Sequence, residues 1–446
     1  MARDGFSSRF GVLAATVGSA VGLGNIWMFP YQVGSQGGAG FLLIYILASL
    51  LVGLPLMITE LSLGRSGRTD SIGLYRKLAP NTGWWLIGVL GVIAAMLIMA
   101  FYSSVIGWVF AYVVKAADGS LLGLNASALK ATFGSLVSNP TTSLAWQCVV
   151  LIVAGAILTL GVSRGIEATT KRLMPLLLLL LILVAVRSLT LPGAMQGVAF
   201  LFLPDFSRIN ADVVLRALGL AFFKMSLAIG CMTVYGSYFR EEQNIPKTAL
   251  TVMLADLAVS MLAGLAIFPA VFALGFDPAR GPALLFETLP AVFQQIPMGS
   301  LLMVAFFVLT AFAAIGALLS MVEVPIAVMN ERAGLSRRAA TWSVIVVTMA
   351  IGSLATLSNS TLADVKWFGM GFFDLFDFAS SKVLMPICGF LISLFIALRW
   401  GRTNFIEANS NHGKLHNQTL ASTTFTVATR ITPVLILVIL LVGLWQ

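Results

Sequence analysis

Apolar stretches long enough to cross a membrane follow one another along almost the whole chain, and this feature most limits the possible folds. About 20 apolar residues in a helix cross the roughly 30 Å of hydrocarbon in a bilayer, where every backbone polar group must be bonded inside the protein. The composition agrees, with 59% hydrophobic and 10% charged residues. We predict an all-α integral membrane protein whose spans are residues 10–33, 39–64, 84–115, 143–161, 167–188, 212–239, 247–274, 300–330, 338–358, 365–398 and 427–445.

The charges predict how the chain lies in the membrane. The polar residues before the first span lead directly into it, so no cleavable signal peptide is expected and the N-terminus stays in the cytoplasm. With that start, most of the 27 Lys and Arg residues fall on the cytoplasmic side, as the positive-inside rule requires. An odd number of spans then places the C-terminus outside, and the expected location is the inner (plasma) membrane.

Other functional classes lack support in the sequence. The net charge of +9 is explained by topology, so no nucleic-acid partner is expected, and no obligate protein partner is evident. Cys148, Cys231 and Cys388 fall within spans and are expected to pack as small apolar residues rather than to bind a metal. No nucleotide-binding loop or metal-ligand cluster accompanies the spans. Neither an ATP-driven pump nor an enzyme is predicted.

The first span is interrupted between Gly18 and Pro30, where the sequence reads GSAVGLGNIWMFP. Glycine and proline should break a helix here, and a broken backbone in mid-membrane persists only where protein or a water-filled cavity satisfies its polar groups. Such a break can direct N–H and C=O groups at a ligand. The alternative is a glycine-rich face for close helix packing.

The sixth span carries a second interruption, Phe222 to Gly230. Two interrupted spans that lie five spans apart are typical of an inverted repeat that encloses a transport site. The predicted units are a cytoplasmic segment at 1–9, a first five-span repeat at 10–188, a second at 189–398, a cytoplasmic loop at 399–426 and a peripheral eleventh span at 427–446.

Several polar residues lie deep in the spans. Lys224 and Asp256 fall on consecutive spans and suggest an ion pair, unless each extends separately to water. Glu60 needs a partner, and the exposed backbone of the broken first helix is the expected one. Tyr102 either offers its hydroxyl to a ligand or bonds a neighbouring carbonyl.

These residues, taken together, resemble the neurotransmitter:sodium symporter family over nearly the whole chain, in particular its bacterial eleven-span amino-acid transporters. The resemblance rests on a set of motifs that would each be weak alone: Gly18 to Asn25 with Trp27, Phe29-Pro30, Gly37-Gly38, Phe41, Pro55, Glu60, Phe101-Tyr102, Phe222-Phe223, Ser226-Leu227, Tyr235 to Tyr238 and Glu323 to Pro325.

The resemblance implies the leucine-transporter fold and alternating access around a site at the membrane midplane. Backbone amides near Gly22 and Gly24, helped by Tyr102, would hold an amino-acid carboxylate, and carbonyls near Ala20, Phe223 and Ser226 would meet the ammonium. Gly22 stands where monoamine transporters use Asp, which favours a substrate with its own carboxylate. An apolar pocket for the side chain implies a neutral amino acid. Its implied lining is Ile98, Tyr102, Phe223, Ile229, Ala317, Ser320 and Met321.

The ion sites depart from the family pattern. One family sodium site keeps Gly18 and Val21, but Gly316 and Ala317 replace its two hydroxyl ligands. The other would include Ala20 and Asn25, with Lys224 and Asp256 in place of a Thr and an Asn. An ammonium there would repel sodium, because a hard cation prefers an all-oxygen shell. Leu220 replaces a Gln near the chloride site, so we expect neither sodium nor chloride, while a proton stays possible.

The gates also differ from the family. Arg3 and Glu331 match the internal pair, whereas Met28 replaces the external Arg and leaves Asp377 without its usual partner unless Lys382 serves. The predicted function is alternating-access transport of a neutral amino acid or zwitterionic analogue without sodium, either coupled to protons or uncoupled. The alternatives are a sodium-coupled symporter that uses residual carbonyl ligands, and a substrate sensor or channel on the same fold.

Overall fold

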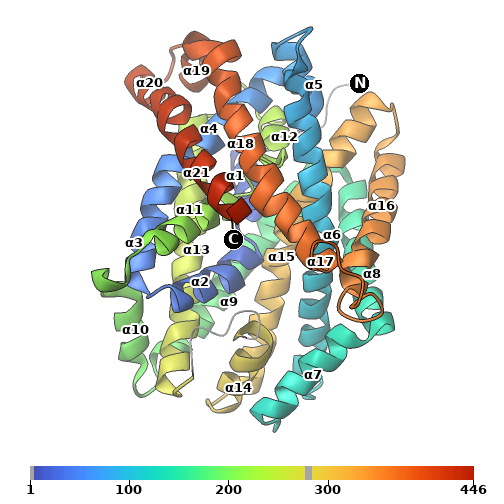
Figure 1. Ribbon diagram of the computed structural model, residues 1–446, viewed down its shortest axis with the longest axis vertical. Coiled ribbons are helices and arrows are strands. Elements are labelled where there is room, and N and C mark those ends of the chain that lie inside the picture. The colour runs from blue at the N-terminus through green and yellow to red at the C-terminus, as the bar shows by residue number, and fades with distance from the viewer. Residues whose placement is uncertain (1–4, 277–283, 446) are drawn as a thin grey trace.

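The computed structural model describes residues 5–276 and 284–445, which form a bundle of helices (Figure 1). Within these residues, nine helical segments are long and apolar enough to cross a membrane, and a bent pair adds a tenth. The uninterrupted helices of this set include α6 (Leu86–Ala117), α8 (Pro140–Thr159), α9 (Ala168–Leu189), α13 (Ile245–Ala273), α15 (Gly299–Arg332) and α16 (Arg337–Leu357).

The bent pair is the first predicted span. Helix α1 (Arg9–Ala20) ends at the first glycines, and the chain resumes as a π-helical turn, η1 (Gly24–Met28), that continues into α2 (Phe29–Ser35). The two halves meet at an angle of 52°. The predicted interruption of this span is therefore present.

The sixth predicted span is also divided. Helix α11 (Ala211–Lys224) and helix α12 (Cys231–Ser237) are separated by a non-helical segment, residues 225–230. Three residues of this segment adopt positive φ: Ser226 (53°), Ala228 (64°) and Gly230 (85°). Only glycine takes this conformation without strain, so the surrounding contacts must hold the first two in place.

Five π-helical turns each end two residues before a proline. Proline has no N–H and its ring crowds the carbonyl four residues earlier, so the turn before it widens to bonds across five residues. In η1, for example, the Phe29 N–H donates to Gly24 O. The turns are η1, η2 (Ser49–Gly53), η6 (Leu284–Thr288), η7 (Phe378–Leu384) and η9 (Val427–Ile431), before Pro30, Pro55, Pro290, Pro386 and Pro433.

The remaining spans also combine several helical pieces. The second joins α3 (Ala39–Ala48), η2 and α4 (Leu54–Gly67), and the tenth joins α17 (Phe372–Asp377), η7 and α18 (Met385–Phe395). Helix α21 (Thr432–Trp445) follows η9 at the end of the chain. The unit boundaries predicted from the sequence stay predictions.

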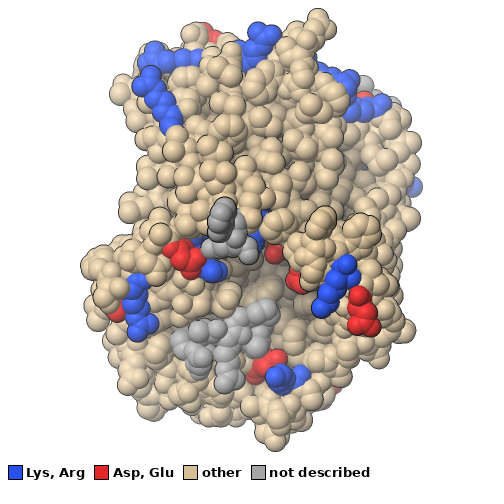
Figure 2. Space-filling model, in the orientation of Figure 1, with Lys and Arg blue, Asp and Glu red and all other residues tan. Residues whose placement is uncertain are grey.

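Helix α15 runs through the centre of the bundle and packs against α6, α9 and α1. The short helices α5 (Ser71–Leu78), α19 (Gly401–Asn409) and α20 (Gln418–Thr426) gather at one end of the molecule, and α7 (Ala126–Ser138), α10 (Ala194–Phe202) and α14 (Leu289–Gln294) gather at the other (Figure 1). Figure 2 shows mostly Lys and Arg among the charges at the first end, then a region with almost no charge. Lys and Arg thus concentrate at one end of the molecule, whereas the orientation of the chain in the membrane stays a prediction.

Candidate functional site

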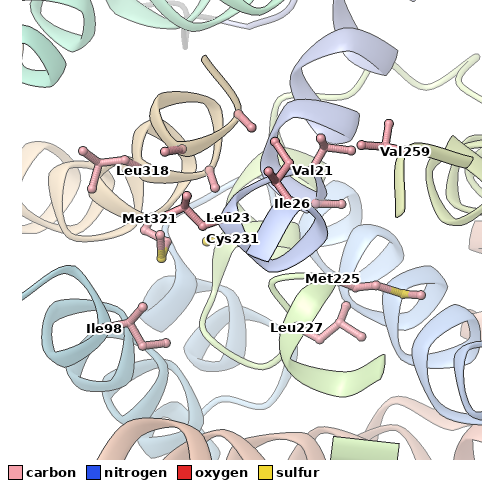
Figure 3. Packing of buried hydrophobic residues seen from close by; sticks show 14 of the residues in the cluster. Val21, Leu23, Ile26, Ile98, Met225, Leu227, Cys231, Val259, Leu318 and Met321 are labelled. Atoms are coloured by element: carbon pink, nitrogen blue, oxygen red, sulfur yellow. The ribbon is translucent and has the colours of Figure 1, made fainter. Parts of the chain in front are cut away.

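The two broken spans meet inside the bundle. The Ser226 hydroxyl, in the second break, donates to the carbonyl of Ser19 at the end of α1, at 2.8 Å. Figure 3 shows the apolar residues that surround both breaks, including Val21, Leu23, Ile26, Ile98, Met225, Leu227, Leu318 and Met321. The polar backbone of each break is therefore enclosed by protein, as a membrane interior requires.

Glu60 supports the second break, not the first as expected from the sequence. Its Oε1 accepts a hydrogen bond from the Ala228 N–H at 2.6 Å, and the carboxyl group is fully buried. The reason is close packing of α4 against α12: a Cβ on Gly64 would lie 2.0 Å from Thr233 O. This contact places Glu60 beside residues 225–230.

A small cavity of about 40 Å³ lies where the breaks meet. It is lined by all the substrate-site residues implied by the resemblance except Ser320, whose hydroxyl is buried nearby and accepts a hydrogen bond from Ser19 Oγ at 2.8 Å. The lining is mainly apolar and includes Ala20, Gly22, Gly24, Ile98, Tyr102, Phe223, Ser226, Ile229, Ala317 and Met321, together with Ser19, Lys224 and Met385. The role of these residues in binding stays a prediction.

Two backbone amides of the first break are hydrogen-bonded beside this cavity, which Gly22 and Tyr102 line. The Gly22 N–H donates to Asn25 Oδ1 at 3.0 Å, and the Leu23 N–H donates to the Tyr102 hydroxyl at 3.2 Å. A Cβ on Gly22 would lie 2.9 Å from the Ala317 Cβ and 3.1 Å from that hydroxyl, so a residue with a side chain would crowd both groups. These amides, near the start of a helix, are suited to a carboxylate.

Lys224 and Asp256 form the predicted ion pair. Lys224 Nζ lies 3.1 Å from Asp256 Oδ2, and both side chains are fully buried. The ammonium also donates to Ser260 Oγ and lies 4.9 Å and 4.8 Å from the ring centres of Phe29 and Tyr45. Because this pair is enclosed on all these sides, neither charge extends separately to water.

Asn25 connects this pair to the cavity. Its Nδ2 donates to Asp256 Oδ1 at 2.7 Å and to Ser260 Oγ at 3.0 Å, while its Oδ1 accepts from Gly22. The orientation of the Gly22 amide therefore depends on α13, the helix that carries Asp256 and Ser260.

Gly18 and Gly316 face each other where the sequence predicts a degenerate sodium site. A Cβ on Gly316 would lie 2.9 Å from Gly18 O and 3.4 Å from the Met174 methyl carbon. Ala317 lines the substrate cavity, and Val21 directly follows α1. Positions 316 and 317 carry no hydroxyl group. Of the sodium ligands implied by the resemblance, only the backbone carbonyl oxygens therefore remain.

The internal gate is only partly described. Arg3 lies outside the described residues, while Glu331 accepts hydrogen bonds from Thr69 Oγ1 and from the Asp70 N–H, each at 2.8 Å. The pairing of Arg3 with Glu331 therefore stays a prediction.

Two clusters of charged residues, around Glu323 and around Glu167, were not predicted from the sequence. Arg337 donates two hydrogen bonds to buried Glu323, at 2.7 and 2.6 Å, and the Tyr238 hydroxyl donates to the same carboxylate at 2.6 Å. Buried Glu167 accepts from both Ser7 and Ser8, and lies 2.5 Å from Lys171 Nζ. For Glu323 the available signal was an acidic residue deep in an apolar stretch, because such a group needs a partner. Glu167 begins its predicted span and gives no such signal.

Met28, Asp377 and Lys382, the residues of the external gate, line a second cavity of about 220 Å³. Asp377 Oδ1 accepts a hydrogen bond from Ser381 at 2.6 Å, and Lys382 Nζ lies 5.9 Å from the Phe378 ring. Within the described part of the chain, Lys382 makes no salt bridge with Asp377, so Ser381 satisfies this carboxylate instead.

Comparison with known proteins identifies the family. The model of the sodium:neurotransmitter symporter family matches residues 3–126 and 132–446. The chain belongs to this family. A solved structure, that of MhsT in complex with L-phenylalanine, shares 38% sequence identity, covers 99% of this chain and 100% of that one, and superposes with a TM-score of 0.91. The all-α leucine-transporter fold expected from the sequence is thereby confirmed.

Relatives in this symporter family extend the comparison. The "uncharacterized sodium-dependent transporter YhdH" of Bacillus subtilis (strain 168) is 42% identical over 98% of this chain and 96% of its own length. The "sodium-dependent neutral amino acid transporter B(0)AT3" of Rattus norvegicus is 32% identical over 60% of this chain and 47% of its own length. The protein is thus an integral membrane protein of a transporter family rather than of an enzyme family.

The expectation that no sodium takes part is wrong. Relatives that match nearly the whole chain are named sodium-dependent, and sodium appears in the family description itself. The expectation gave weight to the lost side-chain ligands at positions 224, 256, 316 and 317. Backbone carbonyls are also good ligands for a hard cation, and substitutions do not remove them.

Proposed function

We propose that this protein is an alternating-access symporter that carries a neutral amino acid together with sodium. The observation that supports this most directly is the mainly apolar cavity between the two breaks, beside which backbone amides and the Tyr102 hydroxyl lie. The carboxylate binds the amides of the first break, the ammonium binds carbonyls near Ala20, Phe223 and Ser226, and the substrate side chain meets Ile98 and Met321.

Sodium is a co-substrate in this proposal. Its ligands are backbone carbonyls of the first break, those of Gly18 and Val21, which need no particular side chain. Met174, whose methyl group lies beside Gly18 and Gly316, is unbranched and flexible and can give way to the ion.

The proposed topology places the N-terminus in the cytoplasm and the C-terminus on the outer side of the plasma membrane, as the distribution of basic residues favours.

Uptake of labelled neutral amino acids into proteoliposomes tests this function. With an inward sodium gradient, we expect accumulation that is lost when choline or potassium replaces sodium. Counterflow of labelled substrate separates a carrier from a sensor or channel, because exchange requires a carrier cycle. Absence of counterflow for every neutral amino acid would contradict the proposal.

Replacing Tyr102 by phenylalanine should weaken substrate binding with little loss of folding. A charge-assisted hydrogen bond between the hydroxyl and the carboxylate contributes about 1 to 3 kcal/mol, or roughly 5- to 150-fold in affinity. Equilibrium binding of labelled substrate measures this change. The half-buried Tyr31 does not line this cavity, so Tyr31→Phe is the control, and equal affinities of the two variants would remove Tyr102 from the site.

A further inference from the structure

The Lys224 ammonium occupies a cage built from groups that bind monovalent cations. We define this cage by the Asp256 carboxylate, the Ser260 hydroxyl and the ring faces of Phe29 and Tyr45. Carboxylate and hydroxyl oxygens coordinate hard cations, and aromatic faces attract any cation. The charged ends of Lys224 and Asp256 have no exposed surface, so the cage is closed to water as it stands.

The lysine enters the cage across the first break. A Cβ on Gly24 would lie 2.8 Å from Lys224 Cγ, so the aliphatic part of the side chain rests on the Gly24 backbone. The contacts come from four helices: Lys224 ends α11, Asp256 and Ser260 lie on α13, Phe29 begins α2 and Tyr45 lies on α3. One cationic side chain thus connects the second break to three other elements.

Each oxygen of the Asp256 carboxylate already has partners. Oδ1 accepts from Asn25, and Oδ2 accepts from the Tyr45 hydroxyl at 3.0 Å and from Lys224. A free cation would have to displace the Lys224 ammonium from Asp256. The displaced ammonium would then be a buried charge without a partner, which is strongly unfavourable. The cage is therefore filled by the protein itself.

We propose that Lys224 is a tethered counter-cation of Asp256 that fills a monovalent-cation position beside the substrate cavity, so that the sodium used in transport binds elsewhere. This rests on the proposed function. By keeping Asp256 charged and bonded, Lys224 also holds Asn25, which in turn orients the Gly22 amide. Lys224 is thus a positioning residue for the substrate carboxylate.

Truncation of the lysine tests the cage. Lys224→Ala leaves a buried carboxylate and space for a free ion, so a cation that binds only the folded state should stabilise this variant. We expect its melting temperature to rise by several more degrees than that of the wild type when sodium chloride replaces choline chloride at equal ionic strength. An unchanged response in folded Lys224→Ala would overturn the proposal.

Two controls separate the cage from a general effect of charge. Lys224→Ala/Asp256→Asn removes the anion that would recruit the ion, so the additional response to sodium should disappear. Asp212→Asn/Arg216→Ala removes an exposed ion pair from the same helix, whose charged atoms lie 2.7 Å apart, and should respond as the wild type does. An equal additional response in either control would also overturn the proposal.

A second variant serves if Lys224→Ala does not fold. Asp256→Asn keeps the size of the side chain but weakens its bonds to Asn25 and Lys224. We expect a several-fold higher KM for the amino acid and an unchanged half-saturating sodium concentration, because the coupling ion binds elsewhere. Selective loss of the sodium response in folded Asp256→Asn would overturn the proposal, whereas failure of the wild type to transport would overturn only the proposed function.

Discussion

Replacing Gly22 by alanine should abolish most substrate binding in a protein that still inserts and folds. The added methyl carbon would lie 2.9 Å from the Ala317 Cβ and 3.1 Å from the Tyr102 hydroxyl, at the wall of a cavity of only about 40 Å³. It would cover the amides that are proposed to hold the carboxylate. We expect a loss of about a hundredfold or more in affinity, roughly 2.7 kcal/mol.

Equilibrium binding of labelled amino acid to purified Gly22→Ala measures this loss, with the melting temperature as the check on folding. The matched control is Gly134→Ala, because Gly134 is exposed on α7 and a Cβ there would meet no atom within 4 Å. Near-normal affinity in a folded Gly22→Ala protein would mean that the break serves another purpose. Gly24 is the less specific choice, because a side chain there meets Lys224 first.

Replacing Arg337 by methionine should strongly destabilise the protein. The variant would leave the Glu323 carboxylate, which has no exposed surface, without the cation that gives it two hydrogen bonds. Removing one partner of a buried pair costs about 3 to 5 kcal/mol, and the partial exposure of Arg337 favours the lower end.

A lower melting temperature of Arg337→Met in detergent would show this cost, and Arg338→Met provides the control, since Arg338 is the exposed neighbour on the same helix. Glu323→Gln/Arg337→Met should recover part of the loss, because the uncompensated charge is then gone. Equal melting temperatures for Arg337→Met and Arg338→Met would exclude the pair as a stabilising contact.

Much of the fold could be predicted because hydrocarbon allows few solutions. A long apolar stretch must be helical, and the closely spaced glycines of the first span predict the break near Gly22. A second break lies at residues 225–230, whereas single prolines such as Pro269 and Pro325 are accommodated within continuous helices. The pairing of Lys224 with Asp256 was predictable for a similar reason, since two buried opposite charges need each other. Neither result required knowledge of how the helices pack.

Partners that depend on packing were harder to predict. The backbone of both breaks could satisfy Glu60, and only the close approach of α4 and α12 selects Ala228. Arg337 and Glu323 are 14 residues apart on different helices, and the turn between α15 and α16 brings them together. The role of sodium was missed because the sequence shows which side-chain ligands are lost but does not show where backbone carbonyls point.

The sequence by itself determined that this chain spans a membrane with helices, that two of its spans are broken, and that its buried charges must be paired. These follow from the cost of exposing a backbone or a charge to hydrocarbon, which depends only on composition along the chain. The tertiary structure decided the individual contacts: Asn25 donates to Asp256 and accepts from the Gly22 amide, and Glu60 binds the second break instead of the first. The contact of Asn25 with Asp256 joins residues 231 positions apart, and that of Glu60 with Ala228 joins residues 168 positions apart, so only the packing of helices against one another can select them.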